Sequence, residues 1–563
     1  MNRTTWHKAW AVGFALSLAL AGGASAKDFN DADIRSIPVY HHGRVMPWDT
    51  LAKVAAETIS EGGSYVKLQL EGYYTPDQLA DDARLKPALE MFPEGKQRKV
   101  PASEMLLSWM IESEKWEEVP FILCEHAAVH EVLGLKSKTD GGLHRKYVSP
   151  RMIAESQSLV DYVESWRERR MSVESADEKF KPTPTDELVE KLLVRYRVYR
   201  KLTHDPRLPL RAAQTIMPGD RSEFLGVLSK ALDRLDEQNA KGSNLEQMLA
   251  TFVDLGQSQG LGEDLSSAAR GELAALADLR LLASRMFPAS AGPSGEAPPP
   301  QQPPTLAEAE AAVVQLRKAS LRLVDVFEEQ KNRAFEEGRM TEDQARTIRP
   351  MFHELTSKAG SLTVLARQMH LALYDNGATG DFFKERDQFR YNASVYVAPA
   401  LNPAALAKNR DPMSEAEPWL TLKAVLYGSD DLLLSDAWPQ ESFDRGRIKA
   451  VRAAWKDLAA AYQNRGADGR AAAVETAAAA LNKSLRQLGE DVEPKRERLV
   501  AAELSADQID EHLLAYTAYP SAARLAPELA YNAVKPFQWA WVICFFSVLA
   551  FGQSFSKLRA AAF

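Results

Sequence analysis

Cysteine is nearly absent from this chain. Its 563 residues include two cysteines, Cys124 and Cys544, so an internal disulfide framework is not expected. A chain of this length buries enough apolar surface to fold without such cross-links. We therefore expect Cys124 to be a small buried hydrophobic residue, whereas Cys544 falls in a long apolar run near the carboxyl end.

Several motifs of catalysis and cofactor binding are missing as well. The sequence has no P-loop, no Gly-x-Gly-x-x-Gly, no Cys-x-x-Cys and no Cys-x-x-Cys-His. The last absence indicates that this chain does not itself attach c-type haem. A basic stripe is also missing, because 69 basic and 77 acidic residues are well mixed, with a net charge of −8 at pH 7. This charge pattern does not indicate a nucleic-acid partner.

The amino-terminal end carries an export signal. Arg3 and Lys8 flank the start, an apolar run covers residues 9–21, and the small residues Ala-Ser-Ala follow. These three parts are typical of a secretory signal peptide, which we assign to residues 1–26 with cleavage after Ala26. An uncleaved amino-terminal anchor is the alternative, but the run is shorter than the roughly 20 residues that a membrane span requires.

The carboxyl-terminal end predicts a transmembrane helix over residues 536–556. No charged residue lies between Lys535 and Lys557, and two tryptophans stand near the start of the stretch, as in an interfacial aromatic belt. Lys557 and Arg559 place the carboxyl end in the cytoplasm under the positive-inside rule. We therefore expect a single-pass protein of the cytoplasmic (inner) membrane, with its bulk in the periplasm or an equivalent extracytoplasmic space.

A proline-rich stretch divides the exported part. Residues 288–305, "PASAGPSGEAPPPQQPPT", have the composition of a semi-extended linker or exposed loop. We place an N-terminal helical lobe at residues 27–287 before it and a C-terminal helical lobe at residues 306–530 after it.

Most of both predicted lobes has helical periodicity. In "LVEKLLVRYRVYRKL", leucines and tyrosines recur at steps of three and four, and residues 305–340 continue such a pattern. Residues 446–489 predict a helical hairpin that turns at "NRGADG". Strand candidates are few, namely "RSIPVY", "EVPFILC" and "ASVYVAPAL", which could form a small strand pair between distant segments. The predicted fold class is mainly α: two helical extracytoplasmic lobes with a few short strands, plus one C-terminal transmembrane helix.

Two patterns are formal candidates for enzyme chemistry. "GQSQG" around Ser258 matches the nucleophile motif G-x-S-x-G, but its surroundings are helical and predict no parallel sheet, so we interpret Ser258 as a loop residue. In "CEHAAVHE", His126 and His130 share one face of a helix, where two imidazoles could hold a metal. Ala127 replaces the glutamate of H-E-x-x-H, so we favour a pair of solvent-facing histidines.

The stretch "IPVYHHGRVMPWDTLA", residues 37–52, contains two adjacent histidines. His41 and His42 could ligate haem or a metal, but neighbours on an extended segment point to opposite faces, so one centre could use only one of them.

The same stretch also has the features of a helix start. Pro47 suits a first helical turn, Asp49 favours the helix dipole there, and Arg44 could pair with Asp49 across the turn. We therefore predict a structural clasp of Arg44, Pro47, Asp49 and Thr50, without chemistry of its own.

Three stretches together resemble a known family. "IPVYHHGRVMPWDTLA", "SEMLLSWMIESEKWEEVPFILCEHAAVHEVLGL" and "ELAYNAVKPFQWAWVICFFSVLAF" are similar, in that order, to segments bracketing the exported region of large cytochrome c biogenesis proteins of the CcsA/ResC type, the System II haem-handling family. The likeness is greatest to planctomycete-like and Bacteroidetes-like forms. The three stretches cover under a fifth of the chain.

The resemblance implies a role in cytochrome complex assembly. Family members handle haem with a tryptophan-rich periplasmic loop and histidines on several transmembrane helices, and none of those residues can be carried over to a position here. The implied partners are a multi-span haem-handling membrane protein (CcsA/ResC-like) and apocytochrome c, with haem bound through that partner. In the third stretch, Tyr531, Asn532, Pro536 and Phe537 are the expected membrane hinge.

Two rival interpretations remain open. One is a membrane-anchored helical scaffold unrelated to haem. The other is a tethered hydrolase that uses Ser258 or a metal held by His126 and His130. No complete catalytic motif occurs in this chain, so we expect an accessory role rather than an enzyme.

Overall fold

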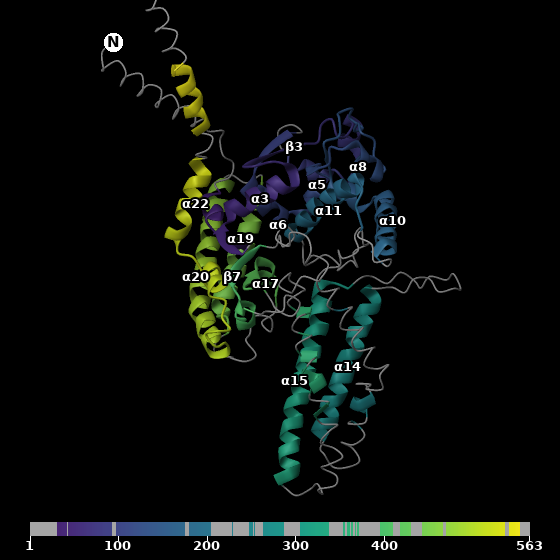
Figure 1. Cartoon of the computed structure of the whole chain (residues 1–563), viewed down its shortest axis with the longest axis vertical. Coiled ribbons are helices and arrows are strands. Elements are labelled where there is room, and N and C mark those ends of the chain that lie inside the picture. Colours follow the sequence, from purple (N-terminus) through teal and green to yellow (C-terminus); the bar gives the residue numbers. More distant parts are fainter. Residues whose placement is uncertain are drawn as a thin grey trace, which may run out of the picture.

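The computed structural model describes a mainly helical protein (Figure 1). The described residues are 31–41, 43–92, 97–174, 180–203, 263–286, 304–336, 395–408, 417–428, 442–465, 469–534 and 540–551, with short stretches between 228 and 370. In these residues helices predominate, and the strands between them are short, with two to five residues each. This confirms the mainly α fold class that the periodicity predicted.

The first part of the described chain alternates short strands with helices. Its elements are α2 (Ala32–Arg35), β1 (Pro38–His41), β2 (Arg44–Pro47), α3 (Trp48–Ser60), β3 (Tyr65–Gln69), α4 (Pro76–Asp81), α5 (Lys86–Leu89), β4 (Gln97–Pro101), α6 (Ala102–Ile111), α7 (Ser113–Trp116), β5 (Ile122–Leu123), α8 (Ala127–Val132), β6 (Tyr147–Val148), α9 (Pro150–Ala154), α10 (Gln157–Glu174) and α11 (Pro184–Thr203). Leu192, Leu193, Tyr196 and Tyr199 of α11 are buried, as the amphipathic pattern predicted.

A four-stranded antiparallel sheet joins early and late parts of the chain. Its order is β2-β1-β7-β8, where β7 is Tyr396–Pro399 and β8 is Trp419–Thr421. The hairpin of β1 and β2 meets β7 through the pair Tyr40 and Tyr396. The predicted pairing of distant segments is therefore confirmed. Two further sheets have two strands each, β3 with β4 and β5 with β6.

Long helices form the later part of the described chain. Its elements after β7 are η3 (Pro403–Leu406), α17 (Leu422–Tyr427), α19 (Arg445–Gln463), α20 (Arg470–Glu503), α21 (Glu511–Thr517) and α22 (Ala522–Val534). Helices α19 and α20 pack against each other as the predicted hairpin. Helix α20 continues well beyond the predicted end, with Pro494 inside it.

Helices α14 (Glu263–Met286) and α15 (Leu306–Glu336) pack along each other. They form an arm that extends from the rest of the molecule (Figure 1). The predicted proline-rich linker falls between them, and most of it lies outside the described residues. Inside the arm, the hydroxyl of Ser320 donates to the buried carboxyl of Glu272 at 2.6 Å.

Segments before and after the predicted linker share one hydrophobic core. Trp109 and Tyr199 from the earlier part belong to the same cluster of buried residues as Tyr462 and Leu485 from the later part. The arm contributes Leu276 and Leu316 to that cluster as well. Packing of apolar faces therefore links the two predicted lobes rather than keeping them apart.

Residues 540–551 form a helix that projects from the body beyond α22 (Figure 1). Its apolar side chains are exposed, among them Trp541, Ile543 and Phe546. Only this part of the predicted span 536–556 is described. Across the described residues, no helix combines the length and the apolar character that crossing a membrane requires.

Candidate functional site

The stretch that looked chemical in the sequence folds as a hairpin followed by a helix. Gly43 adopts a positive φ of 76° in the turn between β1 and β2, a conformation that costs glycine little. Pro47 stands just before α3, which begins at Trp48. Proline fits this place because its φ is fixed near the required value and no helical hydrogen bond needs its missing N–H.

Asp49 lies in the first turn of α3, as predicted, and it is buried. Its carboxylate accepts from Nε of Arg35 at 3.0 Å and from Nζ of Lys53 at 2.8 Å. The expected pairing of Asp49 with Arg44 is wrong, because Arg44 turns to a different carboxylate. Asp49 therefore fixes α2 and the first turns of α3 relative to each other.

Arg44 on β2 pairs with Glu528 on α22, which lies far away in the sequence but next to β2 in the fold. Its two terminal nitrogens donate to the two carboxylate oxygens of Glu528 at 2.9 and 3.2 Å, which is the bidentate geometry that favours arginine over lysine. The hydroxyl of Thr50 donates to the same carboxylate at 2.8 Å. Residues separated by more than 470 positions are therefore joined side chain to side chain.

Asn532, one turn after Glu528 on α22, adds two contacts to this joint. Its amide donates to the Thr50 hydroxyl at 2.9 Å, and its backbone carbonyl accepts from Nζ of Lys53 at 3.4 Å. A cation near the last carbonyls of a helix complements the helix dipole. We call the set Arg44, Thr50, Lys53, Glu528 and Asn532 the head–tail clasp.

The other end of α22 is also fixed. The ring of Tyr519, three residues before the helix, stacks on Trp419 with the ring centroids 5.6 Å apart, and Trp419 stacks on Tyr40 at 6.1 Å. The indole N–H of Trp419 donates to the carbonyl of Thr517 at 2.7 Å. Because α22 is held at its start by this aromatic stack and at its end by the clasp, its direction from the body is set by packing and hydrogen bonds.

Several predicted site residues are brought together by this arrangement. Arg44, Thr50 and Asn532 meet in the clasp, whereas Tyr531 lies on the outer side of α22 with half of its surface exposed. Pro536 and Phe537 lie outside the described residues.

The sequence interpretation missed Lys53 and Glu528. Lys53 follows Asp49 by four residues, the spacing of a helical ion pair. Glu528 heads the third stretch of the family resemblance. The spacing of Lys53 from Asp49 could have revealed Lys53. The contact of Glu528 with Arg44 could not be predicted, because the two residues lie far apart in the sequence.

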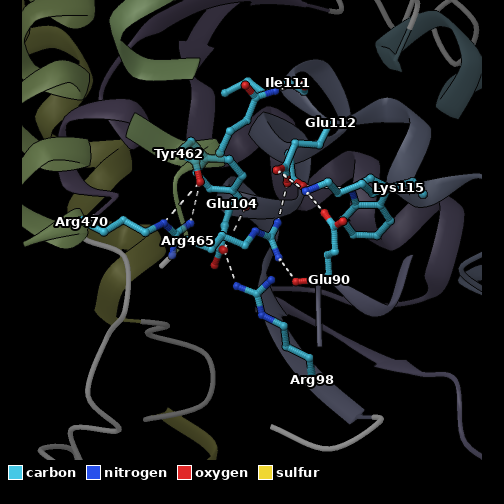
Figure 2. Close-up of polar contacts among 12 residues, drawn as sticks. Glu90, Arg98, Glu104, Ile111, Glu112, Lys115, Tyr462, Arg465 and Arg470 are labelled. Carbon is cyan, nitrogen blue, oxygen red and sulfur yellow. Dashed lines mark hydrogen bonds and ion pairs between the residues drawn. The ribbon is translucent and has the colours of Figure 1, made fainter. Parts of the chain in front are cut away.

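A second polar joint lies in the interior, where the turn between α19 and α20 meets α6 and α7 (Figure 2). Glu112 is fully buried and pairs with Nη2 of Arg465 at 2.5 Å and with Nζ of Lys115 at 3.0 Å. Glu104, also buried, pairs with Arg98 at 2.5 Å and accepts from the hydroxyl of Tyr462 at 3.1 Å. We call the set Arg98, Glu104, Glu112, Lys115, Tyr462 and Arg465 the turn latch.

Two members of the turn latch have shifted pKa values, Lys115 and Tyr462. Burial lowers the pKa of Lys115, but hydrogen bonds to Glu90 and Glu112 outweigh burial and raise that pKa above its ordinary value. Burial raises the pKa of the Tyr462 hydroxyl well above its ordinary range, so the phenol stays a donor to Glu104. The contacts of the turn latch therefore hold the end of α19 against α6 and α7.

The histidines of "CEHAAVHE" do not share a helical face. His126 precedes α8 with an extended backbone and an exposed side chain, whereas His130 is buried within the helix. Nε2 of His130 donates to the carbonyl of Cys124 at 2.6 Å, and burial lowers the pKa of the imidazole. The expected solvent-facing pair is thus wrong for His130. Among the described residues, no group of three or more potential ligands is placed to hold a metal ion.

The remaining candidates divide between the core and the undescribed parts. Cys124 is buried as predicted, and burial raises the pKa of its thiol to about 12, which leaves it unreactive. His41 is buried in β1. His42 and Ser258 lie outside the residues that the structure describes.

Comparison with known proteins finds no matching family model, no matching curated protein and no matching solved structure.

Proposed function

We propose that this protein is a membrane-tethered, extracytoplasmic module of a cytochrome c maturation apparatus. Its helical body acts as a scaffold that binds a partner, either a multi-span haem-handling membrane protein or apocytochrome c, close to the site where haem is delivered. Haem would be held by the partner. The tether is the apolar segment 536–556, and the export signal is residues 1–26.

The head–tail clasp is the observation that carries this proposal. Two of the three stretches that resemble the family, near the start and near the end of the exported region, touch each other through Thr50, Glu528 and Asn532. In the sequence they are separated by more than 470 residues. A scaffold that presents a partner at the membrane needs a defined position for the segment that leads to its tether, and the two attachments of α22 hold that segment on the body.

The turn latch supports the same role from the interior. Its buried ion pairs join α6 and α7 to the α19–α20 turn, and buried pairs of this kind hold one arrangement of segments when both partners are present. The body would therefore act as one rigid unit on the tether.

Co-purification tests the partner assignment. The full-length chain, tagged at its carboxyl end, is extracted from its native membrane in mild detergent and captured, and co-captured proteins are identified by mass spectrometry. A multi-span haem-handling protein in the wild-type capture supports the proposal. Capture of the intact chain without any such protein would instead favour a helical scaffold unrelated to haem.

A protease test addresses the proposed location separately. Protease added to intact spheroplasts should digest the body, because the proposal places it outside the cytoplasmic membrane. A body that resists digestion in intact spheroplasts but is digested after lysis would overturn the proposal.

A further inference from the structure

The two-stranded sheet of β3 and β4 exposes a face that is basic and free of acidic side chains. Its outward residues are Tyr65, Lys67, Gln69, Gln97, Lys99 and Pro101, since the alternate residues Val66, Leu68 and Val100 are buried. Strand alternation places all six on one side of this sheet. We call these six residues the basic face.

The two lysines of the basic face stand directly opposite each other. Lys67 and Lys99 are cross-strand partners in the antiparallel register, and like charges in that position destabilise a strand pair. Nζ of Lys99 lies 4.5 Å from the ring centroid of Tyr65, a cation–π contact that leaves the charge exposed. Among the described residues no carboxylate pairs with either lysine. The described residues therefore leave the repulsion between Lys67 and Lys99 uncompensated.

The position of the β3–β4 sheet within the molecule indicates which kind of surface the basic face could bind. In Figure 1, β3 lies at the end of the body nearer to the exposed apolar helix 540–551, and the arm of α14 and α15 lies at the opposite end. Lysines on an edge strand also discourage sheet-to-sheet pairing, so exposure alone would not identify a partner. A basic face at the end from which an apolar helix projects is complementary to an anionic lipid surface.

We propose that the basic face rests on the anionic headgroups of the bilayer that holds the tail helix. This inference depends on the membrane tether of the proposed function. Lipid phosphates supply the negative charge that Lys67 and Lys99 lack, and tyrosine favours the depth of the headgroups because its ring is apolar and its hydroxyl is polar. The body then contacts the membrane at a second place besides the tether 536–556, so the lipid charge sets the tilt of the scaffold.

Amine acylation of the reconstituted full-length chain tests the contact. The protein is placed in vesicles of phosphatidylcholine alone and in vesicles that also contain phosphatidylglycerol, and the acylation rates of Lys67 and Lys99 are measured by peptide mass spectrometry. Lys318 on α15 is the reference, since it is exposed and belongs to the arm. We expect phosphatidylglycerol to slow acylation of both lysines about threefold or more relative to Lys318. About 1 M salt, with a Debye length of about 3 Å, should remove the protection.

Paired variants separate charge from shape. Hydrogen exchange of the strands β3 and β4 should slow in phosphatidylglycerol vesicles for the wild type and for the control Lys318→Gln. The double variant Lys67→Gln and Lys99→Gln should lose this dependence on lipid charge. A double variant that retains the lipid-dependent slowing would overturn the inference.

Three further outcomes would also overturn it or the proposal beneath it. Equal acylation in both vesicle types, while the chain resists carbonate extraction, removes the lipid contact and leaves the tether intact. Loss of the chain from both vesicle types on carbonate extraction removes the tether and with it the proposed function. Protection in detergent that rises with protein concentration assigns the basic face to contact between copies of the chain.

Discussion

The turn latch and the head–tail clasp are both polar joints between distant segments, yet they differ in burial. Glu112 of the turn latch is fully buried between Arg465 and Lys115. In the clasp, the side chain of Arg44 is 49% exposed and that of Glu528 is 26% exposed. Loss of one partner in a buried pair leaves a charge without solvent, whereas water replaces the lost partner at the surface. The turn latch therefore maintains the packing of α19 against α6 and α7. The head–tail clasp sets the direction of α22, which salt can change because the clasp is partly solvated.

The largest expected effect comes from Glu112→Ala in the turn latch. Because the substitution leaves Arg465 and Lys115 without the carboxylate they share, we expect the free energy of unfolding to fall by about 3–5 kcal/mol. The control is Glu90→Ala, which removes another partner of Lys115 whose own side chain is 63% exposed, and should cost less than about 1 kcal/mol. Chemical denaturation of the detergent-solubilised chain measures both. Equal losses in the two variants would contradict the role assigned to burial.

Glu272 in the arm is a buried carboxyl that no cation of the described residues pairs with, so it extends the comparison. Burial raises its pKa to about 7, against an ordinary value of 4.5, although the Ser320 hydrogen bond lowers it. The folded state therefore keeps a proton that the unfolded state loses, and its stabilising effect is complete below about pH 4.5 and is lost as pH rises to about 7. The expected change is about 3 kcal/mol. Stability measured between pH 4.5 and 7 should show this slope in the wild type and lose it in Glu272→Gln; an identical slope in both would assign it to other groups.

Asp49→Ala tests an intermediate case, since Asp49 is buried while both of its cationic partners reach solvent. Hydrogen bonds to a charged group are lost, and Arg35 and Lys53 are more exposed than the two partners of Glu112. We therefore expect a loss of about 1.5–3 kcal/mol. Glu57→Ala, an exposed position on the same helix, is the matched control and should be nearly neutral. Unchanged thermal unfolding of Asp49→Ala would count against the predicted structural role of this residue.

Gly489→Ala tests the aromatic stack that holds the start of α22. A Cβ at this position of α20 would overlap the ring of Tyr519, which must shift away from Trp419, at a cost of about 1–3 kcal/mol. Gly271→Ala on α14 is the control because nothing lies within 4 Å of its added Cβ, and it should stabilise its helix by up to about 1 kcal/mol. A neutral Gly489→Ala variant would show that the position of the Tyr519 ring in the stack does not matter for stability, against its role in holding the start of α22.

Glu528→Gln in the clasp should have the smallest effect on unfolding, below about 1 kcal/mol, because the pair with Arg44 is partly solvated. Its effect should be local: limited proteolysis within α22 becomes faster, while the rest of the body is cleaved as before. High salt should have the same effect on the wild type, since a solvated pair is screened. The control Glu131→Gln, an exposed position on α8, should leave cleavage of α22 unchanged, and faster cleavage there would remove the link to the clasp.

Local patterns predicted the elements well, and tertiary pairing decided what they could not. The leucine and tyrosine spacing of α11, the α19–α20 hairpin and the start of α3 after Pro47 were all readable from the sequence. The partner of Arg44 was predicted wrongly because Asp49, five residues away, is the only carboxylate in the stretch 37–52. The fold brings Glu528 to Arg44 from a distant part of the chain. His130 was predicted to face solvent as one of a histidine pair, but its side chain is buried and bonds to the carbonyl of Cys124, a tertiary contact that helical spacing does not reveal.

The central claim is that α22 is held at one angle to the body by the head–tail clasp and the aromatic stack. Pulsed electron–electron double resonance tests this claim most directly, because it measures the distance between two spin labels. The labels are placed at Glu57→Cys on α3 and Ala530→Cys on α22 in a Cys544→Ser background. The account predicts a single narrow distance distribution for this pair, broadened when Glu528→Ala is added. A distribution that is already broad with Glu528 in place would contradict it.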